Sequence, residues 1–286
     1  MERTFEDTSL YAIHADEGIR ICRSGQDQPI VAQQAAAHKR PYIHPIVAPD
    51  GRGTLTENAP PHHPWQHGLY VGLNQVNGIG FWEEGLLGNP ADGSFHPKPL
   101  AMPWTRGNRA GWHVETDWHS PEGDTMLTER QEWSLEDCGS RYHLDLMWTL
   151  SARVDLVFGQ YAYGGLFLRM PYLHEAGGEA VNDRGQANQD AEAQAARWVA
   201  VSMPIEGRED WAGIAIMDDP GNPEHPVRWR VDGQLGIAPS RCIAGDWRLA
   251  KGQSQTFRYR SLVYTGRTDA ALVQASWDQF AGGDRG

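Results

Sequence analysis

Hydrophobic and polar positions alternate along many short segments of the chain. From Arg141 to Leu150, apolar side chains occupy every second position, and the residues between them are polar or charged except for Met147. A period of two is that of a half-buried β-strand, whose successive side chains point to opposite faces. Patterns of strand length also occupy Thr128–Leu135, Gly164–Met170, Trp211–Met217 and Gln255–Tyr264. Because Gly, Pro, Asn and Asp clusters separate these segments, we predict an all-β fold of antiparallel sheets packed as a sandwich.

Helical patterns are confined to two segments. Thr268 is a candidate N-cap before residues 269–280, where apolar side chains recur at roughly helical spacing. This pattern predicts a short C-terminal helix. The Ala-, Glu- and Gln-rich segment Asn188–Arg197 is either a short helix or a surface loop.

One long segment and the absence of repeats define the expected organisation. Gly85–Trp104 is rich in Gly and Pro and predicts a long loop, which in a compact domain is usually functional. No internal repeat and no linker divides the sequence. We therefore expect a single β-sandwich domain over residues 1–286, with a frayed tail at 281–286.

Composition excludes several kinds of partner. The 286 residues carry 25 Lys and Arg against 37 Asp and Glu, a formal net charge of −12. This acidity, without a basic run, argues against nucleic acid or an anionic membrane as a partner. No apolar run reaches the roughly 18 residues of a membrane-spanning helix, so no membrane association is expected. A homo-oligomer is left open.

The N-terminal sequence and the cysteines bear on the compartment. The opening residues MERTFEDTSLY are charged and lack the apolar core of a secretory signal. Cys22, Cys138 and Cys242 lie far apart, which favours a reducing compartment over a disulfide framework. We therefore expect a cytoplasmic location.

Tryptophan is unusually frequent, with 12 residues. Trp148 and Trp277 lie on the apolar faces of a predicted strand and the predicted helix, which indicates core packing. Trp65, Trp82 and Trp229 stand beside polar clusters instead. Because an aromatic face suits the apolar face of a sugar ring, these three are candidate sugar platforms.

Residues 62–67 read HHPWQH and place three histidines within six positions. Histidine changes charge near neutral pH and is also a common metal ligand. The loop therefore allows acid–base chemistry or sugar binding by His63 and His67, or a metal site made by His62, His63 and His67. A third alternative is a loop whose histidines only satisfy backbone groups. Since no HExxH or CxxC motif is present, we predict no cofactor and leave a divalent metal open.

Two arginines are further candidates. Pro41 and Pro45 favour extended backbone in the residues before them and hold the side chains of Arg40 and Tyr42 in fixed directions. The planar guanidinium of Arg40 can bind a carboxylate or neighbouring hydroxyls, although a surface arginine beside a rigid turn is an equal alternative. Arg169 lies inside an apolar strand, which is costly unless the charge is paired or faces a cleft.

The loop Asp218–Pro226 follows an apolar strand, and its turn residues do not account for the pair Glu224–His225. The candidate catalytic residues are therefore His63, His67, Glu224 and His225. The candidate substrate-binding residues are Arg40, Tyr42, Trp65, Gln66, Asn77, Trp82, Arg169 and Asn222.

Several long segments resemble a bacterial family of poorly known function that carries the label methane-oxygenase PmoA-like. The matching segments include RPYIHPIVAPDG (40–51), HHPWQHGLYVGLNQVNGIGFW (62–82) and WAGIAIMDDPGNPEHPVRW (211–229). Related members often have an acid and a histidine where this chain has His62 and Gln66. The resemblance implies a β-supersandwich similar to galactose mutarotases and, as substrate, a carbohydrate or an oxidised glycoside.

Three hypotheses follow for function. The first is a carbohydrate-active enzyme, an epimerase, lyase or hydrolase, that acts on a sugar or a 3-keto glycoside with His63 as acid and Glu224 as base. The second is a metal-dependent oxygenase or lyase that uses His62, His63 and His67. The third is a non-catalytic sugar-binding module.

Overall fold

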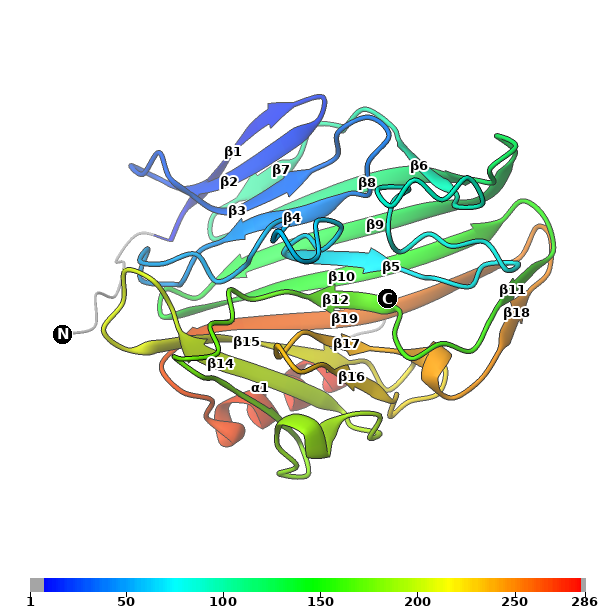
Figure 1. Cartoon of the computed structure of the whole chain (residues 1–286). Coiled ribbons are helices and arrows are strands. Elements are labelled where there is room, and N and C mark those ends of the chain that lie inside the picture. The colour runs from blue at the N-terminus through cyan, green and yellow to red at the C-terminus, as the bar shows by residue number, and fades with distance from the viewer. Residues whose placement is uncertain (1–7, 284–286) are drawn as a thin grey trace.

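The computed structural model of the chain describes residues 8–283, and their strands form two large antiparallel sheets and one small sheet (Figure 1). Sheet A consists, in spatial order, of β1 (Leu10–Ala15), β2 (Gly18–Arg23), β3 (Pro29–Gln34), β4 (Tyr42–Ile46), β5 (Leu69–Gly72), β12 (Gly165–Leu168), β17 (Ile237–Pro239) and β16 (Trp229–Val231). Sheet B consists of β13 (Glu179–Asn182), β14 (Trp198–Pro204), β15 (Trp211–Asp218), β19 (Ser254–Thr265), β10 (Arg141–Ala152), β9 (Thr125–Asp137), β8 (Arg109–His119) and β6 (Ser94–Pro97). Strand β7 (Trp104–Arg106) also pairs with β8, and the small sheet joins β11 (Leu156–Phe158) to β18 (Trp247–Leu249).

The main core lies between the two large sheets and follows from the alternation of side chains. In β5, Leu69 and Val71 enter this core, whereas Tyr70 points to the outer face of sheet A. In β10, Leu144 and Leu146 enter the same core from sheet B. Because each strand buries one set of alternate side chains between the sheets, its other set is available for a site or for a second layer.

The predicted all-β antiparallel sandwich with a C-terminal helix is confirmed. Each of the five predicted strand segments contains or overlaps an observed strand, namely β9, β10, β12, β15 or β19. The prediction of an uninterrupted loop over Gly85–Trp104 is wrong. Ser94 to Pro97 forms β6, which pairs with His119 to Thr116 of β8 and so extends sheet B to this edge.

Helix α1 (Ala270–Gly282) covers the outer face of sheet B, where Val273 packs in a cluster with Trp198 and Met217 (Figure 1). Its N-cap is Asp269 and not Thr268, because the Asp269 carboxylate accepts hydrogen bonds from two backbone N–H groups of the first turn. Among residues 8–283, no helix is long and apolar enough to cross a lipid bilayer.

The remaining helical and terminal predictions have mixed outcomes. The segment Asn188–Arg197 starts as a short 3-10 helix, η1 (Asn188–Ala191), and continues mainly as turns. A second 3-10 helix, η2 (Arg241–Ile243), precedes β18. Residues 281–282 of the predicted frayed tail belong to α1, and 284–286 lie outside the described residues. Most of the N-terminal segment that argued against a secretory signal also lies outside them.

Much of the tryptophan belongs to the interior. The indole groups of Trp118 and Trp148 donate hydrogen bonds of 3.0 and 2.7 Å to the buried carboxyl of Glu129. Trp148 is therefore a core residue, as its position in the strand predicted. Trp229 is also fully buried and donates to the carbonyl of Ala196, so its candidacy as a sugar platform was wrong.

Candidate functional site

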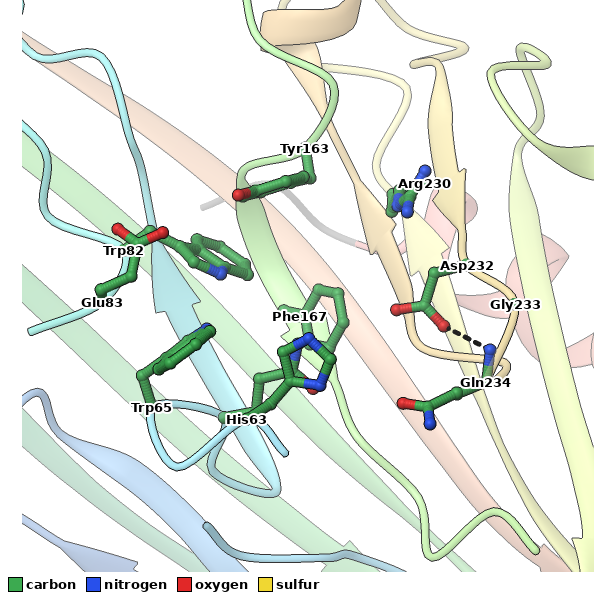
Figure 2. Close-up of a pocket in the computed structure, with 11 residues that line it drawn as sticks. His63, Trp65, Trp82, Glu83, Tyr163, Phe167, Arg230, Asp232, Gly233 and Gln234 are labelled. Atoms are coloured by element: carbon green, nitrogen blue, oxygen red, sulfur yellow. Dashed lines mark hydrogen bonds between the residues drawn. The ribbon is translucent and has the colours of Figure 1, made fainter. Parts of the chain in front are cut away.

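A pocket of about 290 Å³ opens on the outer face of sheet A (Figure 2). Outward-facing Tyr70 and Phe167, from the paired strands β5 and β12, pack together beneath it with 5.4 Å between ring centroids. The loops that adjoin β5 and β12 form one part of its walls, and β16 with the β16–β17 turn forms the other. The residues that line it are His63, Trp65, Gln66, Trp82, Glu83, Tyr163, Phe167, Arg230, Asp232, Gly233 and Gln234.

The two sides of the pocket differ in chemistry. On one side the rings of Trp82 and Tyr163 lie 4.5 Å apart, and Trp65 continues this aromatic wall. Figure 2 shows Asp232 and Gln234 on the opposite side, with His63 between the two walls. The pocket therefore offers an apolar surface that faces hydrogen-bonding groups.

His63 is held by its own loop. Its backbone N–H donates to the Pro60 carbonyl at 2.9 Å, and its ring packs edge-on against Trp65 at 5.5 Å. Burial lowers the pKa of His63, the neighbouring charges of His62 and Arg169 lower it further, and Asp232 opposes them. His63 is therefore neutral at pH 7 and able to accept a proton.

Asp232 occupies the turn between β16 and β17. One carboxylate oxygen accepts hydrogen bonds of 2.9 Å from the backbone N–H groups of Gln234 and Gly236, and this oxygen fixes the turn. Gly236 is required there, because a Cβ at this position would come within 2.5 Å of Phe167 and 2.7 Å of the other Asp232 oxygen. Asp232 is thus a rigidly placed carboxylate beside the pocket.

A chain of polar contacts runs from the polar wall to Glu57. His62 Nε2 lies 3.0 Å from the side-chain oxygen of Gln234 and 3.1 Å from a guanidinium nitrogen of Arg169. The Arg169 Nε donates in turn to Glu57 at 2.9 Å. Arg169 is therefore paired, as its position in an apolar strand required, and it ties the histidine loop to the turn of Asp232.

A second buried network lies behind the aromatic wall. Arg40 donates to Glu84 at 2.8 Å and to the carbonyl of Trp82, and the other Glu84 oxygen lies 3.3 Å from His67 Nε2. Burial alone would raise the pKa of Glu84, but Arg40 and His67 together hold it below its usual value. His67 also contacts Asn58 at 2.7 Å, so both of its ring nitrogens are occupied and it does not line the pocket.

Several buried polar atoms around this pocket find no hydrogen-bond partner among the described residues. They belong to Arg40 (Nη1), His63 (Nδ1), Gln66 (Oε1), Tyr70 (Oη) and Arg169 (Nη1). An unsatisfied buried polar group costs about 1–3 kcal/mol, so such groups are kept for a reason. Their concentration around one pocket is typical of a site that completes its hydrogen bonds with a ligand.

The predicted site residues divide into two groups around the pocket. Four of them line it: His63, Trp65, Gln66 and Trp82. Another four lie beneath or beside it: Arg40, Tyr42, His67 and Arg169. Tyr42 stacks on His67 with 4.5 Å between ring centroids, and so acts on the buried network instead of the pocket.

Asn77 has a structural role. It adopts a positive φ of 52°, as the Asn-Gly turn predicted, and its amide donates to the carbonyl of Asp155 at 3.0 Å. It does not line the pocket.

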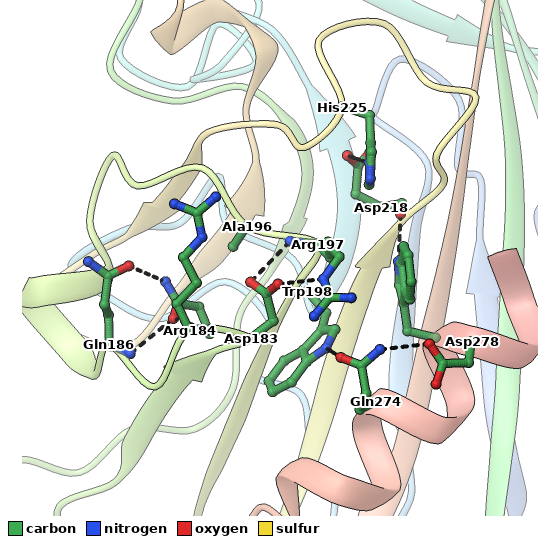
Figure 3. Close-up of polar contacts among 12 residues, drawn as sticks. Asp183, Arg184, Gln186, Ala196, Arg197, Trp198, Asp218, His225, Gln274 and Asp278 are labelled. Carbon is green, nitrogen blue, oxygen red and sulfur yellow. Dashed lines mark hydrogen bonds and ion pairs between the residues drawn. The ribbon is translucent and has the colours of Figure 1, made fainter.

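The loop Asp218–Pro226 lies against α1 and does not line the pocket (Figure 3). His225 Nδ1 lies 2.7 Å from the Asp218 carboxylate, which also accepts a hydrogen bond from Asn222. The His225 ring is parallel to Trp277 of α1, with 6.2 Å between centroids. The structure therefore does not bring Glu224, His225 and Asn222 to the pocket of His63, and the carboxylates that line this pocket are those of Asp232 and Glu83.

The side chains of His62 and His67 in the histidine loop engage different partners. His62 contacts Arg169 and Gln234, and His67 contacts Asn58 and Glu84, so the rings turn to separate partners. Within residues 8–283, no three His, Cys, Asp or Glu side chains are arranged to hold a metal ion. This geometry gives the metal hypothesis no support.

Sequence reasoning missed several residues of this site. Asp232 and Gln234 belong to a VDGQLG turn whose Asp-Gly signal indicates only a turn. Glu84 follows Trp82 in a loop without a distinctive motif, and Tyr163 and Arg230 stand alone. The one available signal was the position of Asp232 after a short apolar strand, where β-folds commonly display site residues.

The chain belongs to the family described as "Family of unknown function (DUF6807)", whose model matches residues 26–278. No curated protein matches the sequence significantly. The description of the family gives no activity, so the expected methane-oxygenase PmoA-like label has no support.

Solved structures of similar fold include an alpha-galactosidase from Lactobacillus brevis, with 13% identity, a TM-score of 0.47, and coverage of 96% of this chain and 43% of that chain. A galactose mutarotase related enzyme from Lactobacillus acidophilus has 9% identity and a TM-score of 0.36 over 91% of this chain and 99% of that chain. An alpha-galactosidase variant from Geobacillus stearothermophilus has 10% identity and a TM-score of 0.40 over 90% of this chain and 41% of that chain. This chain spans less than half the length of either alpha-galactosidase.

Proposed function

We propose that this chain binds a carbohydrate in the pocket of Figure 2 and removes a proton from it with His63. The observation that carries the proposal is the pairing of an aromatic wall with a polar wall around a neutral histidine. Trp65 and Trp82 form the first wall, and Asp232 and Gln234 belong to the second. A pyranose has one apolar face of C–H groups and a rim of hydroxyls, and this pocket complements both.

The size of the pocket supports a single sugar ring as its occupant. Its volume of about 290 Å³ is at the lower end of the range for ligand pockets, which is roughly 300–1,000 Å³. Gln66 and Tyr70 have buried polar atoms without partners among the described residues, and they stand beside and beneath this space. Sugar hydroxyls both donate and accept, so they can satisfy such groups.

The protonation state of His63 suits the role of a general base. Because its pKa is lowered, the neutral ring can take a proton from a sugar hydroxyl, or from a C–H that a neighbouring keto group acidifies. The negative charge of Asp232 favours the imidazolium that forms. After removal from a C–H, return of a proton to the opposite face of the same carbon completes an epimerisation. Departure of a substituent from the neighbouring carbon with its bonding electron pair, as the double bond forms, completes an elimination.

These roles differ from the sequence-based assignment. His63 was expected to act as the acid and Glu224 as the base. The lowered pKa favours the neutral form of His63, which is the form that can act as a base, and Asp232 is preferred to Glu224 because it lines the same pocket.

A substrate screen tests the proposal. The purified protein would be incubated with common aldoses, disaccharides and their 3-keto forms, and the mixtures followed by proton NMR. We expect new sugar signals with at least one compound. Binding of a sugar in the pocket without any product would support the non-catalytic sugar-binding module instead, and neither binding nor product with any compound would contradict the proposal.

A further inference from the structure

A second pocket, of about 490 Å³, lies beside the first on the same loop. It is lined by His44, Thr54, Glu57, Asn58 and Glu206, among others. We infer that it holds a second sugar unit, so that the ligand is an uncharged glycoside of at least two rings. This inference rests on the proposed function and names its substrate class.

A ridge of contacting side chains, Glu57, Arg169, His62 and Gln234, connects the linings of the two pockets. Glu57 lines the second pocket and accepts a hydrogen bond from Arg169, which contacts His62 at 3.1 Å. His62 in turn contacts Gln234, which lines the first pocket. Three successive contacts of about hydrogen-bond length therefore connect the two pockets, and His62 is exposed on this ridge.

The ridge contains a donor without a partner. Arg169 is 1% exposed, and its Nη1 has no hydrogen-bond acceptor among the described residues. A charged donor left unpaired in this way is costly. An oxygen of a ligand that crosses the ridge is the kind of acceptor that this position requires.

The polar groups of the second pocket suit hydroxyls. Thr56 Oγ1 accepts from the Ile46 N–H at 3.0 Å and lies 2.9 Å from His44 Nδ1, so its hydroxyl is free to donate to that nitrogen. Burial lowers the pKa of His44, and the neutral ring then carries its proton on Nε2 as a donor. Hydroxyl groups can accept from His44 and donate to the carboxylates.

The charge of the second pocket also limits its ligand. Glu57 is already paired with Arg169, and the exposed carboxylate of Glu206 disfavours a sugar acid or a phosphorylated sugar, because like charges repel. No Trp, Tyr or Phe side chain is among its lining residues, which suits an outer, more solvated ring. The first pocket, with its aromatic wall, would hold the ring on which His63 acts.

Filling the second pocket tests the inference. Glu206→Trp places a bulky side chain at an exposed position that lines only this pocket. Glu209→Trp is the matched control, since Glu209 is exposed nearby and lines neither pocket. Dissociation constants would be measured by calorimetry for glucose, galactose and mannose, and for maltose, cellobiose, lactose and melibiose.

We expect a preferred disaccharide to bind the unchanged protein about tenfold more tightly than its component monosaccharide, equivalent to one or two net hydrogen bonds. Glu206→Trp should abolish this gain and leave monosaccharide binding intact, whereas Glu209→Trp should retain it. A disaccharide that binds no better, or a gain that survives Glu206→Trp, overturns the second subsite and leaves the proposed function standing. Absence of binding by every sugar overturns both.

Discussion

The side chains of His62 and Gln234 meet across the mouth of the pocket, with 3.0 Å between Nε2 and Oε1. His62 is the neighbour of His63 in the histidine loop, and Gln234 lies two residues after Asp232 in the β16–β17 turn. The two partners are 172 positions apart in the chain. This contact therefore helps to set the position of the base relative to the carboxylate.

Removal of this contact should weaken function more than folding. Gln234→Ala is expected to reduce sugar turnover about tenfold, because small misplacements of reacting groups are costly. Its effect on the free energy of unfolding should stay below about 1 kcal/mol, since the side chain is half-buried at the surface. Gln279→Ala, at an exposed position of α1, is the control for both measurements. Unchanged turnover in Gln234→Ala would remove the positioning role.

Asp232→Asn should move the titration of His63 toward lower pH. The negative charge of Asp232 raises the pKa of His63 against the larger effect of burial, so its loss should lower that pKa further. The shift would be followed by NMR of the His63 ring protons as a function of pH, with Asp278→Asn as a distant control. A shift to higher pH, or no shift, would show that the two groups do not interact.

The aromatic wall gives a prediction for binding. Trp65 is half-buried, so Trp65→Ala should leave the fold intact while sugar affinity falls about tenfold. Trp104→Ala is the control, because Trp104 is 52% exposed and does not line the pocket. Both would be compared by titration of a bound sugar, and equal affinities of the two variants would argue against stacking on Trp65.

Glu129 gives a prediction for stability. Burial raises the pKa of Glu129 to about 7, although Trp118, Gln131 and Trp148 each donate a hydrogen bond to its carboxyl. The pKa of Glu129 is higher in the folded state than the ordinary 4.5. The protonated carboxyl therefore contributes its full stabilisation to the free energy of unfolding below pH 4.5, and this stabilisation is lost as pH rises through 7.

Glu129→Gln removes this titration. Relative to Glu129→Gln, the unchanged protein should therefore lose about 3 kcal/mol of unfolding free energy between pH 4.5 and pH 8. Urea unfolding at several pH values measures it. A difference that stays constant with pH would mean that Glu129 does not titrate in this range.

The sequence predicted the parts of the fold that depend on local pattern. The period-two alternation from Arg141 onward was sufficient to identify β10, because one face of this strand is buried and the other is not. The density of histidine and tryptophan in residues 62–67 likewise pointed to a loop from which His63, Trp65 and Gln66 line the pocket.

Contacts between distant segments could not be predicted. Asp232 comes near His63 because β17 pairs with β12 through Leu168 and Ile237, and a single sequence does not show this register. Conversely, the Glu224–His225 pair looked chemically suitable, yet Asp218 and Trp277 engage His225 beside α1. The position of β6 was also hidden, since its pairing with β8 is non-local.

Proton transfer by His63 is the central claim, and exchange with solvent deuterium tests it most directly. The sugar identified by the screen would be incubated in heavy water with the unchanged protein and with His63→Gln, which retains an amide of similar reach. We expect the unchanged protein to incorporate deuterium at the carbon that loses its proton, and His63→Gln to do so at least about 100-fold more slowly while still binding the sugar. Equal rates in the two proteins would contradict the account.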